Sequence, residues 1–404
     1  MPSPPASRFL DPTTPPHVFT LTFVAAAATL SMNVFLPSLP GMARYFEVDY
    51  RIVQLSVALY LCMNALMQIV VGPLSDRFGR RPVILSGFVI YIFATLGCIY
   101  APNIQVFLGF RMLQAAVVVG VVLSRAAIRD MVPGDQAASL IGYVTMGMSI
   151  IPMIGPSIGG VLDQAFGWKA NFWLQAGAGV AAFLLTWRDL GETITPRAGG
   201  FGAQFRAYPS LLRSPRFWGY CASAALTSGA FFAYLGGAPF VGSEIYGMSP
   251  ARLGFFFGAP AAGYLVGNYL SGRYSIRFGM TKMVFWGALI TAAGLTISLA
   301  LFLLGLGSEY IFFGFMTWVG VGNGMTLPNA NAGMMSVRPE LAGSASGLGG
   351  ALNIGGGAAL SALAGWLLVS GSTAMPLLIL MLTSSALAVV AILFVIRREK
   401  RLNL

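Results

Sequence analysis

The residues of this chain that could do chemistry are a few polar side chains inside long apolar runs. Arg111 is the sole strongly basic residue that we predict well inside a run, and Gln114 follows it by three positions. Because burying an ionisable group in a membrane is costly, such a residue is by default a candidate functional site. We hypothesise that Arg111 faces a central cavity and bonds to Asn33, to Gln114 or to a substrate oxygen. The alternative is that carbonyl groups and Gln114 hold Arg111 for packing alone.

Carboxylates are missing from the predicted interior. All 13 acidic residues fall in loops, tails or helix ends, and none falls near the middle of an apolar run. Proton carriers in membranes usually use an embedded carboxylate, because burial lifts its pKa into the working range. This chain offers only weaker candidates for that task. Asp163, near the outer end of its run, is the candidate proton site, and His17, the only histidine, is equally well explained as a surface residue.

Further polar and aromatic residues interrupt the apolar runs and are candidates for a substrate cavity. Tyr60, Asn64 and Gln68 are four positions apart and therefore share one helical face. A polar stripe avoids lipid, so either a neighbouring helix or a watery cavity must satisfy it. The other candidates for the cavity lining are Asn33, Arg111, Gln114, Phe231, Phe232, Tyr234, Trp318, Asn323 and Asn353.

The residue patterns of enzymes and ATP-driven pumps are not found. With one histidine and no embedded acid, we find no nucleophile with a neighbouring base and no glycine-rich phosphate loop. Cys62, Cys98 and Cys221 each stand alone in a different run, which disfavours a disulfide framework or a metal cluster. We expect no enzymatic activity, no cofactor and no metal. A receptor would be expected to carry a sizeable soluble domain, whereas the longest polar interval here is a linker.

Composition places these residues in a helical membrane protein. Hydrophobic residues make up 56% and charged residues 9% of the 404 positions, whereas a soluble domain carries roughly 25% charged residues. Apolar runs of the length of a membrane-spanning helix centre near residues 28, 63, 92, 116, 150, 179, 228, 263, 293, 322, 355 and 385. We predict an all-α membrane protein with twelve transmembrane helices, surrounded by the lipid bilayer.

The net charge of +11 reflects membrane topology and gives no reason to expect nucleic acid as a partner. If both termini are cytoplasmic, most of the 24 basic residues, Arg125 among them, fall in inner loops and tails. Only Arg44, Arg51, Lys169 and Arg252 fall in outer loops. Because inner loops of membrane proteins carry the excess of Lys and Arg, this pattern predicts the orientation. We expect a multi-pass protein of the bacterial inner membrane with both termini in the cytoplasm.

A polar interval divides the chain into two parallel six-helix repeats. We predict a disordered cytoplasmic tail over 1–16, an N-terminal six-helix bundle over 17–188, a cytoplasmic linker over 189–215, a C-terminal six-helix bundle over 216–396 and a basic tail over 397–404. An offset of 200 positions lays 72-GPLSDRFG-79 over 272-GRYSIRFG-279 and, more weakly, 155-GPSIGG-160 over 355-GGGAAL-360. Repeats of this kind are a known way to build transporters.

The segment 72-GPLSDRFGRRPV-83 resembles the signature between the second and third helices of the major facilitator superfamily in residue type, spacing and place. In that family it is a cytoplasmic gating element, in which Asp and Arg side chains bond across helix ends. The resemblance assigns this role to Gly72, Asp76, Arg77, Gly79, Arg80 and Arg81. The alternative is a basic loop that serves topology only.

Two more segments narrow the resemblance. The segment 111-RMLQA-115 resembles the family's buried Arg-x-x-Gln-Gly element, with Ala115 replacing the glycine. The segment 155-GPSIGG-160 resembles an element of proton-coupled exporters in which Gly155, Pro156, Gly159 and Gly160 would shape a close, kinked helix contact. Together with 328-PNANAGMMSVRPELAGSASG-347, these segments resemble the Bcr/CflA drug-resistance exporters, which are drug:proton antiporters with twelve spanning helices.

The resemblance implies a secondary active transporter that exports small amphipathic drugs or metabolites, such as chloramphenicol-like compounds, by alternating access and in exchange for protons. One departure leaves a second interpretation open. The family's Asp-x-Tyr-Leu-Pro motif reads 33-NVFLP-37 here, so Asn33 replaces the acid and Phe35 the tyrosine. The alternative is an uptake carrier or facilitator for a neutral or anionic solute without carboxylate-based proton coupling. We expect a small-molecule substrate, a proton gradient and a monomer.

Overall fold

Every regular element in the described part of the chain is a helix. The computed structural model describes residues 8–14, 16–131, 134–194, 209–338, 341–369 and 371–402. Within these ranges each of the twelve predicted runs lies in one helical segment, which confirms the predicted all-α fold of twelve segments. Eight of the described segments are long and apolar enough, by length and composition alone, to cross a membrane. The predicted linker falls mostly outside the described residues.

The N-terminal half contains six helical segments, two of which are broken. The first segment bends after Asn33, where Pro37 and Pro40 cannot donate the backbone hydrogen bonds of a continuous helix. The elements are α1 (Val18–Asn33), η1 (Leu36–Ser38), α2 (Leu39–Tyr45), α3 (Tyr50–Phe78), α4 (Arg80–Ile99), α5 (Ile104–Leu113), η2 (Gln114–Val117), α6 (Val118–Met131), α7 (Gly134–Phe166) and α8 (Lys169–Asp189).

The C-terminal half repeats this arrangement. Its first segment ends in a π-helical turn and its second is interrupted at Phe257. The elements are α10 (Pro215–Phe240), η3 (Val241–Ile245), α11 (Pro250–Phe256), α12 (Gly258–Phe278), α13 (Met280–Leu303), α14 (Glu309–Ser336), α15 (Ala342–Leu367) and α16 (Met375–Arg401).

The two repeated octets form the same turn in both halves. Gly79 ends α3 with φ +95° and Gly279 ends α12 with φ +84°, angles that glycine adopts without a Cβ clash. The N–H of Gly79 donates to Ser75 O over 2.9 Å, and that of Gly279 donates to Ser275 O over 2.8 Å. The offset of 200 positions therefore relates equivalent points of the two halves.

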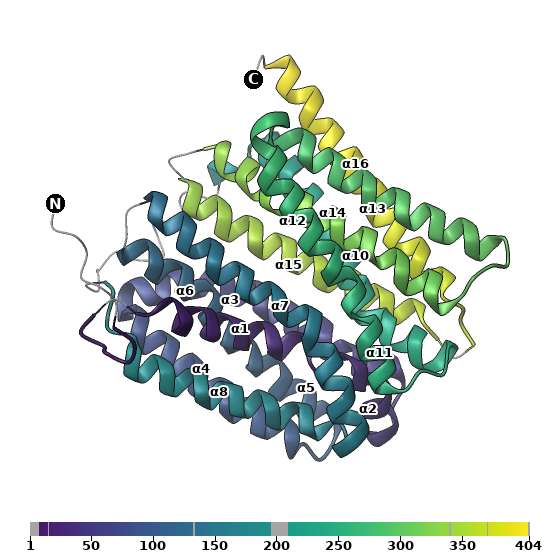
Figure 1. Cartoon of the computed structure of the whole chain (residues 1–404), viewed down its shortest axis with the longest axis horizontal. Helices are drawn as coiled ribbons and strands as arrows, with labels where there is room; N and C mark the ends of the chain where they lie inside the picture. Colours follow the sequence, from purple (N-terminus) through teal and green to yellow (C-terminus); the bar gives the residue numbers. More distant parts are fainter. Residues whose placement is uncertain are drawn as a thin grey trace.

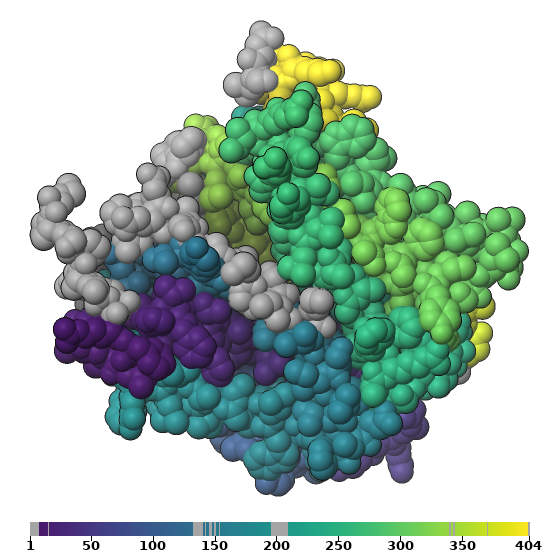
Figure 2. Space-filling model, viewed as in Figure 1, coloured from purple at the N-terminus to yellow at the C-terminus, as the bar shows by residue number. Residues whose placement is uncertain are grey.

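The buried apolar residues are shared between the halves at one end only. We call the end with both chain termini the terminal end and the opposite end, with α2 and α11, the far end (Figure 1). One cluster joins far-end residues of both halves, such as Phe107 and Phe172 with Phe240 and Phe313. The other two clusters are built mainly from one half each. The halves therefore pack together at the far end, and Figure 2 shows the surface hollowed between them toward the terminal end.

Polar contacts close the far end between the halves. The hydroxyl of Tyr50 donates to Gly236 O over 2.8 Å, and Gln54 Nε2 donates to Ser361 O over 2.5 Å and to Ser361 Oγ over 3.0 Å. An ion pair of 3.6 Å between Arg44 and Glu244 adds an exposed contact. The far-end closure thus consists of a few hydrogen bonds and apolar contacts that can separate without breaking either half.

We predict that Gly365→Leu opens this closure. A Cβ at Gly365 would overlap the side chain of Gln54, so a leucine must push α3 and α15 apart. Leu368, which is fully buried in the shared cluster, becomes the reporter as Leu368→Cys in a cysteine-free background. Labelling by a membrane-impermeant maleimide should rise several-fold. The control is Gly314→Leu, where an added side chain meets open space, and equal labelling of both variants would contradict the prediction.

Candidate functional site

A cavity of about 260 Å³ lies between the two halves. The N-terminal half contributes residues of α1, α6 and α7, namely Thr29, Asn33, Arg125, Met148 and Pro152. The C-terminal half contributes Ser228, Phe231, Phe232, Leu235, Phe257, Pro260, Ala261, Tyr264, Gly320, Asn323, Leu327 and Asn353. Four predicted residues, Asn33, Phe231, Asn323 and Asn353, and the associated Phe232 therefore lie at one cavity.

The cavity has an aromatic wall and a set of polar groups facing it. Phe231, Phe232, Phe257 and Tyr264 all come from the C-terminal half. The amide of Asn33 donates to Thr29 O over 2.8 Å, and that of Asn323 donates to Val319 O over 2.9 Å. Both bonds lie within the residue's own helix, and Asn323 Nδ2 also donates to Thr227 O of α10 over 3.3 Å. Asn323 Oδ1 is buried without a hydrogen-bond partner, so it is an acceptor that a bound molecule could satisfy.

Arg125 is the charged group of the cavity, and the sequence analysis placed it wrongly in an inner loop. It lies in α6 six residues before Met131, which corresponds to about 9 Å of helix. Arg125 forms no hydrogen bond or ion pair with the described residues, and its Nε is buried without a partner. No carboxylate occurs among the described residues that line the cavity. The signal that could have found Arg125 is its position inside an uninterrupted helix-length segment, 115-AAVVVGVVLSRAAI-128.

Arg111 lies outside this cavity, in a closed site of the N-terminal half. Its side chain is fully buried between the rings of Phe35 and Tyr60, each 4.2 Å from the guanidinium carbon. It donates to Gln114 Oε1 over 2.6 Å and to Ser31 O over 2.9 Å. The predicted bond to Gln114 is present, whereas Asn33 bonds to Thr29 instead.

The partners of Arg111 form a network that the sequence did not reveal. Gln114 Nε2 donates to Thr95 Oγ1 over 2.7 Å and to Gln175 Oε1 over 3.3 Å. Ser31 Oγ donates to the same Gln175 oxygen over 3.4 Å. The network therefore joins α1, α4, α5 and α8. Cation–π contacts and hydrogen bonds to neutral oxygens offset the cost of burying this cation, with no carboxylate taking part.

The remaining cavity candidates lie elsewhere. Tyr60 is buried against Arg111, while Asn64 and Gln68 bond to each other over 3.0 Å, with Gln68 close to Gly350 of α15. Asn64 and Gln68 are therefore paired within α3, and the Tyr60 hydroxyl is buried without a hydrogen-bond partner. Tyr234 is buried in the far-end aromatic cluster, and Trp318 is 42% exposed on the outer surface, where it packs over Gly294. These positions are not part of the cavity lining.

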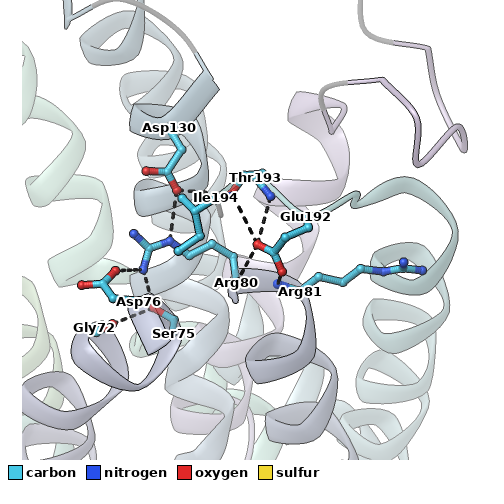
Figure 3. A network of polar contacts seen from close by, with 9 residues as sticks. All are labelled: Gly72, Ser75, Asp76, Arg80, Arg81, Asp130, Glu192, Thr193 and Ile194. Atoms are coloured by element: carbon cyan, nitrogen blue, oxygen red, sulfur yellow. Dashed lines mark hydrogen bonds and ion pairs between the residues drawn. The ribbon is translucent and has the colours of Figure 1, made fainter. Parts of the chain in front are cut away.

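At the terminal end, Arg80 is the centre of a polar network (Figure 3). Its guanidinium pairs with Asp76 over 2.6 Å and with Asp130 over 3.0 Å, and it also bonds Ser75 Oγ. Ser75 Oγ in turn donates to Gly72 O over 2.7 Å. The gating motif thus links the ends of α3, α4 and α6 within one half.

Glu192, which the sequence analysis did not single out, caps α4. Its carboxylate accepts from the N–H of Arg80 over 2.9 Å and from the N–H of Arg81 over 3.3 Å (Figure 3). A carboxylate at a helix N-terminus satisfies unpaired N–H groups and the positive end of the helix dipole. A Cβ at Gly79 would overlap this carboxylate, so a larger residue there would displace Glu192 in addition to straining the turn. Arg77 lies outside the network, with its guanidinium over Phe78 at 5.3 Å.

The segment 155-GPSIGG-160 makes contacts of two kinds at the far end. A Cβ at Gly159 would overlap Val34 O of α1, within the same half. A Cβ at Gly160 would overlap Pro250 O of α11, in the other half, and Pro156 O lies equally close to Gly254. Gly155 has only ordinary contacts with Asn33 and Leu30. This segment therefore packs α7 against both halves.

Asp163 is not near the cavity. It lies in the last turn of α7 at the far end, half-buried and close to Ser38 and Arg44. Among the described residues no group of three or more His, Cys, Asp or Glu side chains could hold a metal ion. The three cysteines are free. Chemically, the described site can bind an amphipathic molecule through ring contacts and hydrogen bonds.

Comparisons with known proteins agree on one family. The family model described as Major Facilitator Superfamily matches residues 21–362 and 243–403. The chain is 29% identical over 331 residues to the chloramphenicol resistance protein of Pseudomonas aeruginosa, covering 80% of this chain and 78% of the relative. It is 26% identical over 390 residues to a bicyclomycin resistance protein homolog of Haemophilus influenzae, covering 95% and 96%.

The fold also matches a solved structure. That structure is a bacterial homolog to the human lysosomal transporter Spinster, in an inward-facing and occupied conformation. The TM-score is 0.72 at 17% identity, and the match covers 95% of this chain and 96% of the other. At this identity the likeness concerns the fold alone.

We predict that Arg111→Ala destabilises the N-terminal half by about 2 to 5 kcal/mol, because it leaves a cavity between two rings and unsatisfied oxygens of Ser31 and Gln114. The measurement is the apparent melting temperature in detergent. The melting temperature of Arg111→Lys should lie between those of the unmodified protein and Arg111→Ala, because one ammonium cannot make all the hydrogen bonds of the forked guanidinium. The control is Arg397→Ala, exposed on the last helix. Equal melting temperatures for Arg111→Ala and the control would contradict this packing role.

Proposed function

Because this chain belongs to the Major Facilitator Superfamily, we propose that it exports small amphipathic drugs or metabolites of the chloramphenicol type by alternating access. The protein is a multi-pass membrane transporter, similar to drug-resistance transporters of the Bcr/CflA type. We infer export as the direction of transport because relatives are named for resistance to chloramphenicol and to bicyclomycin. Resistance by transport requires that the compound leaves the cell.

The observation that carries this proposal is the two-sided cavity between the halves. Aromatic rings on one side and amides with a guanidinium on the other suit a molecule that has both a ring and polar groups. A volume of about 260 Å³ is adequate for a small drug and too small for a peptide of several residues. An amphipathic molecule can therefore contact both halves at once, which is what a substrate of alternating access must do.

Arg125 supports neutral or anionic substrates over cations. At an effective dielectric constant of 20, two like charges about 4 Å apart repel each other by about 4 kcal/mol. No carboxylate among the described lining residues offsets that repulsion. A carboxylate, nitro or carbonyl group could instead accept hydrogen bonds from the guanidinium. The cavity thus disfavours the cationic dyes that many drug exporters carry.

We propose that the far end faces the periplasm and the terminal end faces the cytoplasm of a bacterial inner membrane. The separable contacts of Tyr50 and Gln54 would then form the outer gate, and the Arg80 network would control the inner one. The asymmetry of basic residues supports this orientation. Since both gates and the cavity lie within one chain, a monomer is sufficient for the cycle.

Two schemes for energy coupling are compatible with this cavity, exchange for protons and facilitated transport. Exchange for protons would follow the antiporters of this type, with Asp163 as the candidate proton site at the periplasmic side. A specific observation favours the second candidate, a facilitator for a neutral or anionic solute, because the described cavity residues include no carboxylate. In both cases the same cavity binds the solute, and only the dependence on a pH gradient differs.

We predict that Arg125→Gln changes which charges are transported. Losing a hydrogen bond to a charged donor should weaken binding of an anionic substrate about tenfold or more, while uptake of a monocationic dye into everted vesicles increases. Chloramphenicol serves as the neutral reference. The matched control is Arg129→Gln, one helical turn away and exposed. An unchanged charge preference in Arg125→Gln would remove this residue from the substrate site.

Counterflow in everted vesicles with and without a pH gradient separates the two coupling schemes. For an antiporter, the gradient drives accumulation of the drug, and Asp163→Asn reduces that dependence while counterflow persists. Glu47→Gln, an exposed far-end acid, is the control. Gradient-driven accumulation that survives Asp163→Asn would exclude Asp163 as the proton site. If drug accumulation by the unmodified protein is the same with and without the pH gradient, the protein is a facilitator.

A further inference from the structure

An apolar groove lies on the outer surface of the C-terminal half, away from the cavity. It has a volume of about 380 Å³ and is bounded by α12, α13 and α14. Its walls are Leu270, Tyr274 and Phe278 of α12 with Met283, Trp286 and Ile290 of α13. Tyr274 and Phe278 stack loosely, with ring centroids 5.9 Å apart. The α12–α13 turn belongs to the terminal end, where α16 also ends (Figure 1).

The groove faces the surroundings of the helix bundle. Trp286 is 51% exposed and Phe278 is 45% exposed. Trp and Tyr side chains concentrate at the boundary between hydrocarbon and lipid headgroups, because their rings are apolar and one edge is polar. The groove begins at the last residues of α12 and the first turn of α13. It therefore extends from the headgroup region of one leaflet into the hydrocarbon.

Three basic residues lie on the helices that form the walls of the groove, and the terminal end of these walls is called the groove mouth. The guanidinium of Arg277 lies over the ring of Phe278 at 5.4 Å, so it is held at the groove wall. Lys282 precedes Trp286 by four positions and thus lies one turn closer to the terminal end on the same face of α13. Arg273 precedes Arg277 by one turn on α12. All three cations are exposed, and none forms an ion pair with the described residues.

An acid that contacts the first turn of α13 is already occupied. Glu399 of α16 accepts from Arg216 over 2.9 Å and from Tyr220 over 2.8 Å through Oε1, and from Thr281 over 3.0 Å through Oε2. Both carboxylate oxygens are therefore used inside the C-terminal bundle. Among the described residues none forms an ion pair with these three cations, so the groove mouth can accept a negative group of a ligand.

The equivalent place in the N-terminal half contains a negative group of the protein itself. There Glu192 caps α4 and Asp76 pairs with Arg80. In the C-terminal half Ile276, which is 97% exposed, stands where the repeat has Asp76. A Cβ at Gly279 would meet open space, whereas one at Gly79 would overlap Glu192. The second repeat thus keeps the turn and Arg277, the equivalent of Arg77. It has Met280 in place of Arg80 and lacks the equivalents of Asp76 and Glu192.

We propose that this groove is a binding site for an anionic phospholipid. The phosphate and the negatively charged headgroup bond to Arg273, Arg277 and Lys282, and one acyl chain lies along the apolar walls between α12 and α13. Polybasic clusters at a membrane surface attract anionic lipids, and an apolar slot next to them adds contact with the chain. The proposal depends on the membrane location of the helices and is independent of the transported substrate.

Trp286 provides a direct test, because it forms part of the groove wall. The full-length protein is reconstituted in phosphatidylcholine vesicles that contain an equal fraction of either dibrominated phosphatidylglycerol or dibrominated phosphatidylcholine. Bromine quenches tryptophan fluorescence at contact, and the Trp286 signal is the difference from Trp286→Phe. The expected result is an apparent association constant roughly tenfold higher for phosphatidylglycerol.

Variants assign that preference to the groove. Arg273→Ala with Arg277→Ala and Lys282→Ala should abolish it, and Arg273→Lys with Arg277→Lys should retain it because the charges remain. Arg397→Ala with Arg398→Ala and Arg401→Ala removes equal charge from the end of α16 and should leave it unchanged. Ile290→Phe, which fills part of the groove without adding a tryptophan, should also reduce the preference. Equal quenching by both lipids, or equal loss in the α16 variant, would overturn the proposal.

Discussion

The cost of placing a positive charge among apolar helices shapes this structure. Arg111 is buried with no carboxylate, and two aromatic faces together with neutral oxygens of Ser31 and Gln114 stabilise it. Arg125 lacks such partners and lies at the cavity between the halves. Because aromatic rings and neutral oxygens of the N-terminal half surround the buried guanidinium of Arg111, this residue belongs to the packing of one bundle. The unsatisfied second guanidinium explains where a bound molecule can gain most from a hydrogen bond.

The two repeats share a backbone plan and differ in where they place negative charge. Gly79 and Gly279 form equivalent turns. The N-terminal repeat gathers Asp76, Asp130 and Glu192 around one turn, so its helix ends are tied together by the protein. The C-terminal repeat ties α10, α13 and α16 through Glu399 instead. The two repeats therefore share the turn and differ in the electrostatic contacts around it.

Much of the fold could be predicted from the sequence, and less of the site. Runs of apolar residues fix helix number because each must cross the same thickness of hydrocarbon. Whether a polar side chain of a helix faces the cavity, another helix or lipid depends on which helices pack against it, and the sequence pattern of one helix does not identify those neighbours. Trp318 therefore lies on the surface and Tyr60 against Arg111, although both interrupt apolar runs as Asn323 does. Arg125 was misplaced because an arginine near a helix end looks like a loop residue, and Glu192 was missed because its partner is a backbone more than a hundred positions away.

Two neighbouring glycines of α7 pack against different halves of the molecule. Gly159 touches α1 within its own half, whereas Gly160 touches α11 of the other half. A larger side chain at Gly159 would destabilise the packing of α7 against α1 within the N-terminal half. A larger side chain at Gly160 would instead destabilise the contact between the two halves at the far end. Substitutions at these two adjacent positions would therefore change different properties, the stability of one half and the strength of the contact between the halves.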